Sequence, residues 1–150
     1  MTDEERSSLD DGKVQSDDHA HKLESTMITA KAEYEASKKY AEAMRQRAAG
    51  AAASELAAPK ANLAVAKAIL QQAKEALAQA SQADKTACEA VVKEEHDSLA
   101  AVQSEYEAAL KEAEVKSAHV EAEAQNLVEK SLADCTAAKA EYRAFQDKRA

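Results

Sequence analysis

The chain has 150 residues and a formal net charge of −8; 38 residues are alanine, and only 28 are large and apolar (Leu, Val, Ile, Met, Tyr or Phe). This composition lacks the side-chain volume of a thick globular core. It favours long, closely packed helices, because alanine has the strongest intrinsic helix preference. An acidic chain without a basic patch is not expected to bind nucleic acid. The lack of an apolar run of about 18 residues excludes an integral membrane segment.

The first 18 residues carry seven acids against Arg6 and Lys13, which gives a net charge of −5. They offer too few apolar side chains to bury, so we expect 1–18 to be an acidic disordered tail and 19–150 an elongated helical domain. The chain shows no secretory signal, and two cysteines make no disulfide framework, so we expect a cytoplasmic or otherwise intracellular protein. A secreted fragment that lacks its signal peptide is the alternative.

Helical periodicity begins near Leu23 and continues to Ala48. The pattern then weakens, because Gly50 lowers helix stability and Pro59 removes a backbone donor. The sequence therefore predicts a hinge or turn at 50–59.

A second helix is expected over about 60–81. Its inward residues include Leu63, Leu70 and Leu77. Possible capping residues occur at 81–86 and again at 94–98, so the sequence places a second turn at one of these two segments or lets the helix continue through both.

The longest pattern is an apolar stripe from Leu99 to Phe145, which we call the contact stripe. Its fourteen residues follow at steps of three or four, with the 3.6-residue period of an α-helix. They are Leu99, Val102, Tyr106, Ala109, Ala113, Ser117, Val120, Ala124, Leu127, Ser131, Cys135, Ala138, Tyr142 and Phe145. We expect the interface with another helix to be carried by Leu99, Val102, Tyr106, Val120, Leu127, Cys135, Tyr142 and Phe145.

A repeat of 36 residues, which equals ten helical turns, runs through the chain. Three columns of the repeat are apolar: Met27, Leu63, Leu99 and Cys135; Ala30, Ala66, Val102 and Ala138; and Tyr34, Leu70, Tyr106 and Tyr142. The tetratricopeptide pattern of Trp, Gly and Pro is absent, so the repeat does not indicate that family.

The sequence offers no candidate catalytic, cofactor-binding or metal-binding residues. Its many carboxylates lie on helix surfaces without an apolar pocket that would shift a pKa, and no glycine-rich phosphate loop is present. His19 and His21 alone do not make a zinc site. Cys88 and Cys135 are interpreted as small apolar residues of the helices, with an intermolecular disulfide as the alternative.

These observations predict an all-α fold of long amphipathic helices, packed as an antiparallel three-helix bundle or as an extended coiled-coil-like rod; a four-helix arrangement built on the repeat also remains open. We expect a non-enzymatic structural or scaffolding protein that self-associates as a homo-oligomer or binds another helical protein, without a small-molecule substrate. In its Ala-, Lys- and Glu-rich composition the chain is similar to late-embryogenesis-abundant proteins, although it lacks their 11-residue repeats and excess of Lys. That resemblance implies the alternative function, a stress-related or surface-coating protein that becomes helical on desiccation or lipid contact.

Overall fold

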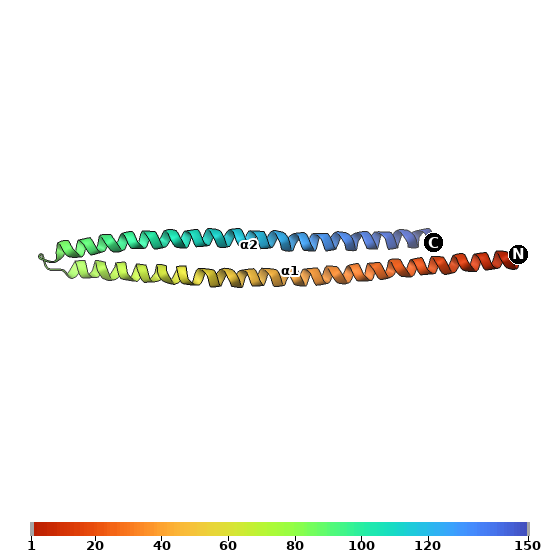
Figure 1. The fold of residues 1–150 in the computed structure, drawn as a ribbon, viewed down its shortest axis with the longest axis horizontal. Helices are drawn as coiled ribbons and strands as arrows, with labels where there is room; N and C mark the ends of the chain where they lie inside the picture. The colour runs from red at the N-terminus through yellow and green to blue at the C-terminus, as the bar shows by residue number, and fades with distance from the viewer. Residues whose placement is uncertain (1, 150) are drawn as a thin grey trace. The chain divides into compact units, whose positions relative to one another are not determined.

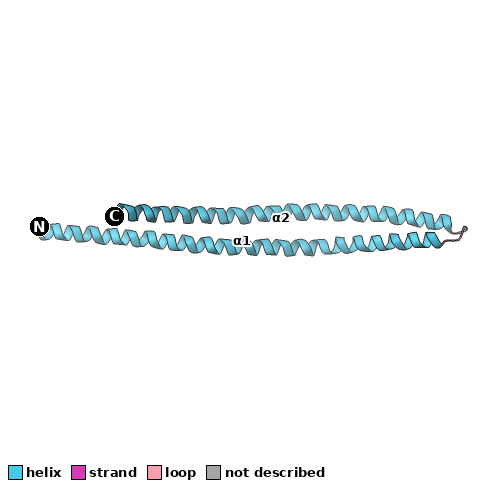
Figure 2. Cartoon of the chain, turned by 180° about the vertical axis from the view of Figure 1, so that it is seen from behind, coloured by secondary structure: helices cyan, strands magenta, loops and turns pink. Residues whose placement is uncertain are grey.

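A computed structural model describes residues 2–149 as two helices, α1 (Asp3–Gln79) and α2 (Lys85–Arg149). Residues 80–84 join them, and no strand occurs among the described residues (Figures 1 and 2). The all-α prediction is confirmed. The chain forms two helices where the bundle prediction has three.

The chain divides into two compact units. Unit 1 contains the residues up to Met44 and those from Ala122 on, and unit 2 contains Arg45–Glu121. In each unit, a part of α1 packs antiparallel against a part of α2 (Figure 1). We call the surface where the two helices meet within a unit the seam.

Residues 3–18 lie in α1, whereas the sequence predicts a disordered tail. A capping box starts the helix: the Glu5 amide donates to the Thr2 hydroxyl at 3.2 Å, and the Thr2 amide donates to the Glu5 carboxylate at 2.9 Å. Acidic residues in the first turn also interact favourably with the helix dipole. Net charge alone does not reveal this local capping signal.

The predicted hinge at 50–59 is also absent from the structure, because α1 continues through this segment with Pro59 inside the helix. Gly50 does not have a positive φ, and alanines at 48, 49 and 51–53 surround it with the residue type that most favours helix. Proline removes only one backbone donor, and its side chain is half-buried in the helix. Strong helix preference and tertiary burial outweigh the two breakers.

The one turn falls at 80–84, which confirms the 81–86 alternative; residues 94–98 lie within α2. Asp84 precedes the first residue of α2, and its carbonyl accepts the first helical bond from the Cys88 amide at 3.0 Å. The Ser81 hydroxyl donates to the Asp84 carboxylate at 3.0 Å, and the Asp84 amide donates to the Ser81 carbonyl, also at 3.0 Å. These bonds close the chain into a hairpin in unit 2.

The seam contains the contact stripe. Thirteen of its fourteen residues are buried or half-buried, and Ser117 is the exposed one. On α1 the shielded residues follow the same steps of three or four, from Leu23 to Leu77. Seven of the nine buried hydrophobic residues of the described chain are alanines, so the two helices approach each other closely.

Replacing Gly50 by alanine should stabilise the protein by about 0.5–1 kcal/mol, because glycine in a helix interior loses more backbone entropy on folding. A methyl group at this position meets no atom within 4 Å. Urea unfolding monitored by circular dichroism measures the difference. The exposed neighbour offers a reciprocal control: Ala51→Gly should lower stability by a similar amount, and an unchanged midpoint for both variants would contradict a continuous helix here.

Candidate functional site

The eight predicted interface residues all lie at the seam, where their own chain covers them. Four belong to unit 2 (Leu99, Val102, Tyr106 and Val120), and four belong to unit 1 (Leu127, Cys135, Tyr142 and Phe145). Cys135 is buried and the other seven are half-buried. The structure thus brings each group of four into a helix–helix contact within one chain; their role towards a second chain stays a prediction.

The core of unit 1 joins residues from both helices. Ala30, Cys135 and Ala138 form its buried cluster, and Met27 and Tyr34 pack against it. Cys135 is only 3% exposed and not disulfide-bonded, and Cys88 is also free. Cys135 therefore fills a small apolar position in this cluster.

The same cluster relates the internal repeat to the fold. All twelve residues of the three apolar columns are buried or half-buried. In unit 1, the first copy (Met27, Ala30 and Tyr34) packs against residues of the fourth copy (Cys135 and Ala138). The repeat thus places equivalent residues at the seam on both α1 and α2.

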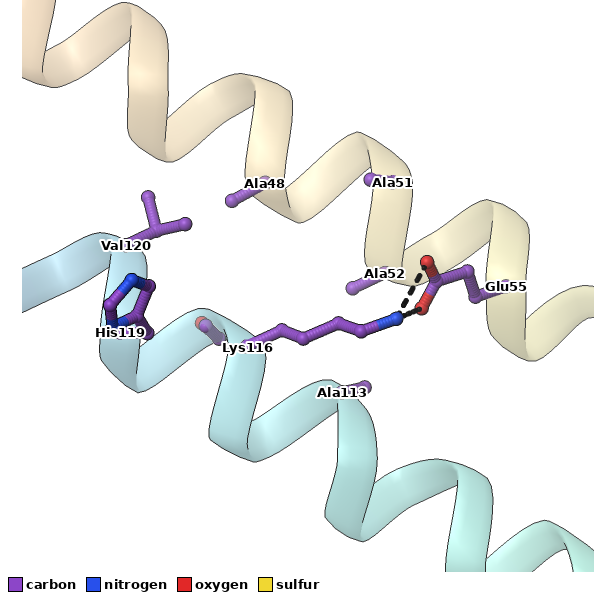
Figure 3. A pocket seen from close by; sticks show the side chains of 9 residues that line it. Ala48, Ala51, Ala52, Glu55, Ala113, Lys116, His119 and Val120 are labelled. Carbon is purple, nitrogen blue, oxygen red and sulfur yellow. Dashed lines mark hydrogen bonds and ion pairs between the residues drawn. The ribbon is translucent and has the colours of Figure 1, made fainter.

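A hollow of about 290 Å³ interrupts the seam in unit 2 (Figure 3). Small residues face each other here, with alanines 48, 51 and 52 on α1 and Ala113 and Ser117 on α2. Glu55, Lys116, His119 and Val120 complete the lining. The hollow exists because methyl and hydroxymethyl groups do not fill the space that larger side chains fill elsewhere along the seam.

An ion pair crosses the seam at the hollow. The Lys116 ammonium donates to both Glu55 carboxylate oxygens, at 3.2 and 3.3 Å (Figure 3), and it lies 3.3 Å from Glu112, one helical turn earlier. Hydrogen bonds to Glu55 and Glu112 raise the Lys116 pKa above its ordinary value of 10.5. The amine is held in its protonated form, which is not nucleophilic, so it serves as a cross-helix contact.

A second ion pair connects Arg45 on α1 with Glu121 on α2. The Arg45 guanidinium donates to both oxygens of Glu121, at 2.7 and 3.0 Å. The hydrogen bond from Arg45 lowers the Glu121 pKa below its ordinary value of 4.5. This pair therefore stabilises the fold above the ordinary carboxyl pKa, and its contribution is lost as the pH falls through the lowered value. Both side chains are solvent-accessible, so the pair mainly fixes geometry.

A hydroxyl pair crosses the seam of unit 1. The hydroxyl oxygens of Ser37 and Ser131 are hydrogen-bonded at 2.6 Å, and the Ser131 hydroxyl also contacts the Leu127 carbonyl at 2.7 Å. Sequence reasoning placed Ser131 in the contact stripe but missed Ser37 and Arg45. Ser37 had a detectable signal, since it lies three residues after Tyr34 and four before Ala41. The partners of these residues could not be found without the helix pairing.

His19 packs edge-on against Phe145, with ring centroids 5.0 Å apart. The Arg149 guanidinium lies over the Phe145 ring, 5.6 Å from its centroid, and donates to the Asp17 carboxylate at 2.5 Å. Among the described residues, no three His, Cys, Asp or Glu side chains gather in a way that would hold a metal ion. His19 is thus part of an aromatic contact between α1 and α2 in unit 1.

No protein-family model, curated protein or solved structure matches this chain. Within the described part of the chain, neither helix contains an apolar stretch of the length needed to span a membrane. The function must therefore be inferred from the seam and its geometry.

Filling the hollow should stabilise unit 2. Ala52→Leu adds three methyl or methylene carbons next to open space, and we expect a gain of about 1–2 kcal/mol. Ala124→Leu is the matched control, because Ala124 in unit 1 is completely buried. Overpacking there should cost about 1–3 kcal/mol. Chemical unfolding of both variants gives the two signs; destabilisation by Ala52→Leu equal to that by Ala124→Leu would contradict the hollow.

Proposed function

We propose that this chain is a structural or scaffolding protein that acts through helix–helix association with another protein chain. The observation that carries the proposal is the contact stripe, whose residues follow helical spacing and are shielded at thirteen of fourteen positions. A long apolar stripe of this kind is suited to packing against a second helix.

The outward faces support the same role. The described residues outside the seam are largely exposed, and acids and bases alternate among them. Exposed ion pairs within one helix, such as Glu35 with Lys38 and Glu112 with Lys116, contribute little stability but keep these faces hydrated. Association by the apolar stripe therefore buries methyl groups and leaves the charges in water.

The narrow seam limits the kind of partner. Ala41 and Ala124 have no exposed surface, so the two helix axes lie close together in unit 1. Only a helix with small residues at the matching positions approaches the stripe this closely. We therefore propose a partner helix rich in alanine, with larger residues at intervals.

A second candidate function follows from the same alanines. A seam whose buried residues are mostly alanine removes little apolar area from water, so its stability per residue is low. A surface-coating or stress-related protein that gains helix only on drying or on lipid would have this property. Circular dichroism in dilute buffer separates the two: cooperative melting of a helical signal supports scaffolding, and a coil that becomes helical only with vesicles supports coating.

The triple variant Val102→Asp, Tyr106→Asp and Leu127→Asp tests the scaffolding role. Each carboxylate would lie at the seam without a partner, and a buried unpaired charge costs several kcal/mol. We expect the loss of cooperative melting and of any assembly larger than a monomer, measured by circular dichroism and sedimentation equilibrium.

The control carries the same three charges on exposed positions, as Ala101→Asp, Ala108→Asp and Asn126→Asp. It should keep the melting temperature within a few degrees of the unmodified protein. If the seam variant retains both its melting temperature and its assembly size, the contact stripe is not an association surface.

A further inference from the structure

The turn at 80–84 is built from residues that a helix accepts. Its sequence, Ala-Ser-Gln-Ala-Asp, contains neither glycine nor proline. No described residue has a positive φ, so no turn residue depends on a backbone conformation foreign to a right-handed helix. What holds the turn is the pair of Ser81 and Asp84, through one side-chain and one backbone hydrogen bond. Little prevents this segment from becoming helical except the loss of those bonds.

The spacing of the seam residues continues through the turn. From Leu77 the chain reaches Ala80, Asp84, Cys88 and Val92 in steps of three, four, four and four residues. These are helical steps. The 36-residue repeat has the same consequence, since ten whole turns would return its columns to one side of a helix running through 80–84. A turn that served only to close a hairpin would not require this phase.

The pairing across the seam is compatible with two chains. Arg45 and Glu121, like Ser37 and Ser131, lie about equally far from the turn along the chain. An antiparallel pair with this register can be formed by α1 of one copy and α2 of a second copy, related by a two-fold axis. Every seam contact then has the same residues on both sides as in the hairpin.

We infer that two copies of this chain associate by exchanging their α2 helices, with residues 80–84 helical in the exchanged form. The inference rests on the proposed function and names its partner: a second copy that offers the same alanine-rich stripe. The two chains cross at the former turn. The hydrogen bonds between Ser81 and Asp84 that close the hairpin are given up there, and helical backbone bonds replace them.

Cys135 provides the test. Ala30→Cys places a second thiol in the cluster that contains Cys135, and Cys88→Ser removes the other thiol. In the hairpin, oxidation joins the introduced thiol to Cys135 of the same chain, which migrates as a monomer on a denaturing gel. In the exchanged form, the same disulfide links two chains. Refolding over a hundredfold range of concentration before oxidation should raise the covalent dimer fraction steadily.

Changes in the turn should shift the balance in this cysteine background. Ser81→Ala with Asp84→Ala removes the closing bond and the residue that precedes α2, and it raises helix preference, so dimerisation should tighten about tenfold or more. The matched control is Asp97→Ala with Ser98→Ala, the same replacements at exposed positions inside α2. The control should leave the dimer fraction unchanged.

The opposite change is Gln82→Gly with Ala83→Gly, which disfavours a helical turn and should lower the dimer fraction. Sedimentation equilibrium without oxidation gives the mass of each variant. A dimeric mass with disulfides only within chains would overturn the exchange and leave helix association standing. A monomeric mass at every concentration, for the unmodified protein and the Ser81→Ala, Asp84→Ala variant alike, would overturn both.

Discussion

Close approach of two helices at alanine positions is the constraint on which the rest of the structure depends. Ala41 and Ala124 are fully buried in unit 1, and any larger side chain there would push the helices apart. Such contacts remove little apolar area each, so stability must accumulate over many of them. Larger residues such as Leu70 in unit 2 and Met27 in unit 1 supply additional burial. The length of the helices is thus a consequence of how thin the seam is.

A thin seam creates a second requirement, which is a fixed register. Alanine surfaces fit together in several alignments, because their side chains do not interlock deeply. Polar pairs restrict the choice: Ser37 with Ser131 in unit 1, and Arg45 with Glu121 and Glu55 with Lys116 in unit 2. These pairs contribute little net energy at the surface, but a shifted helix would leave their donors or acceptors without a partner. The hollow in unit 2 lies beside one of these pairs.

The stripe from Leu99 to Phe145 could be predicted because helical spacing is a local property of the sequence. The turn was also within reach, since Ser81 and Asp84 carry a capping signal. The predicted hinge failed because Gly50 and Pro59 impose penalties that neighbouring alanines and burial outweigh. The pairs across the seam were out of reach. They join residues 61 to 132 positions apart, and their identity depends on a register that single-helix spacing does not contain.

Hairpin and exchanged dimer would share every seam contact, so the free-energy difference between them comes from the turn and from chain connectivity. Within one chain, α2 is presented to α1 at a high effective concentration, which favours the hairpin when the protein is dilute. Two copies regain helix at 80–84 and lose only the hydrogen bonds between Ser81 and Asp84. The short segment 80–84 therefore controls whether the contact stripe is satisfied by its own chain or by another. In that way a stripe that is covered within the monomer can still serve as an association surface, because exposing it and covering it again involve the same contacts.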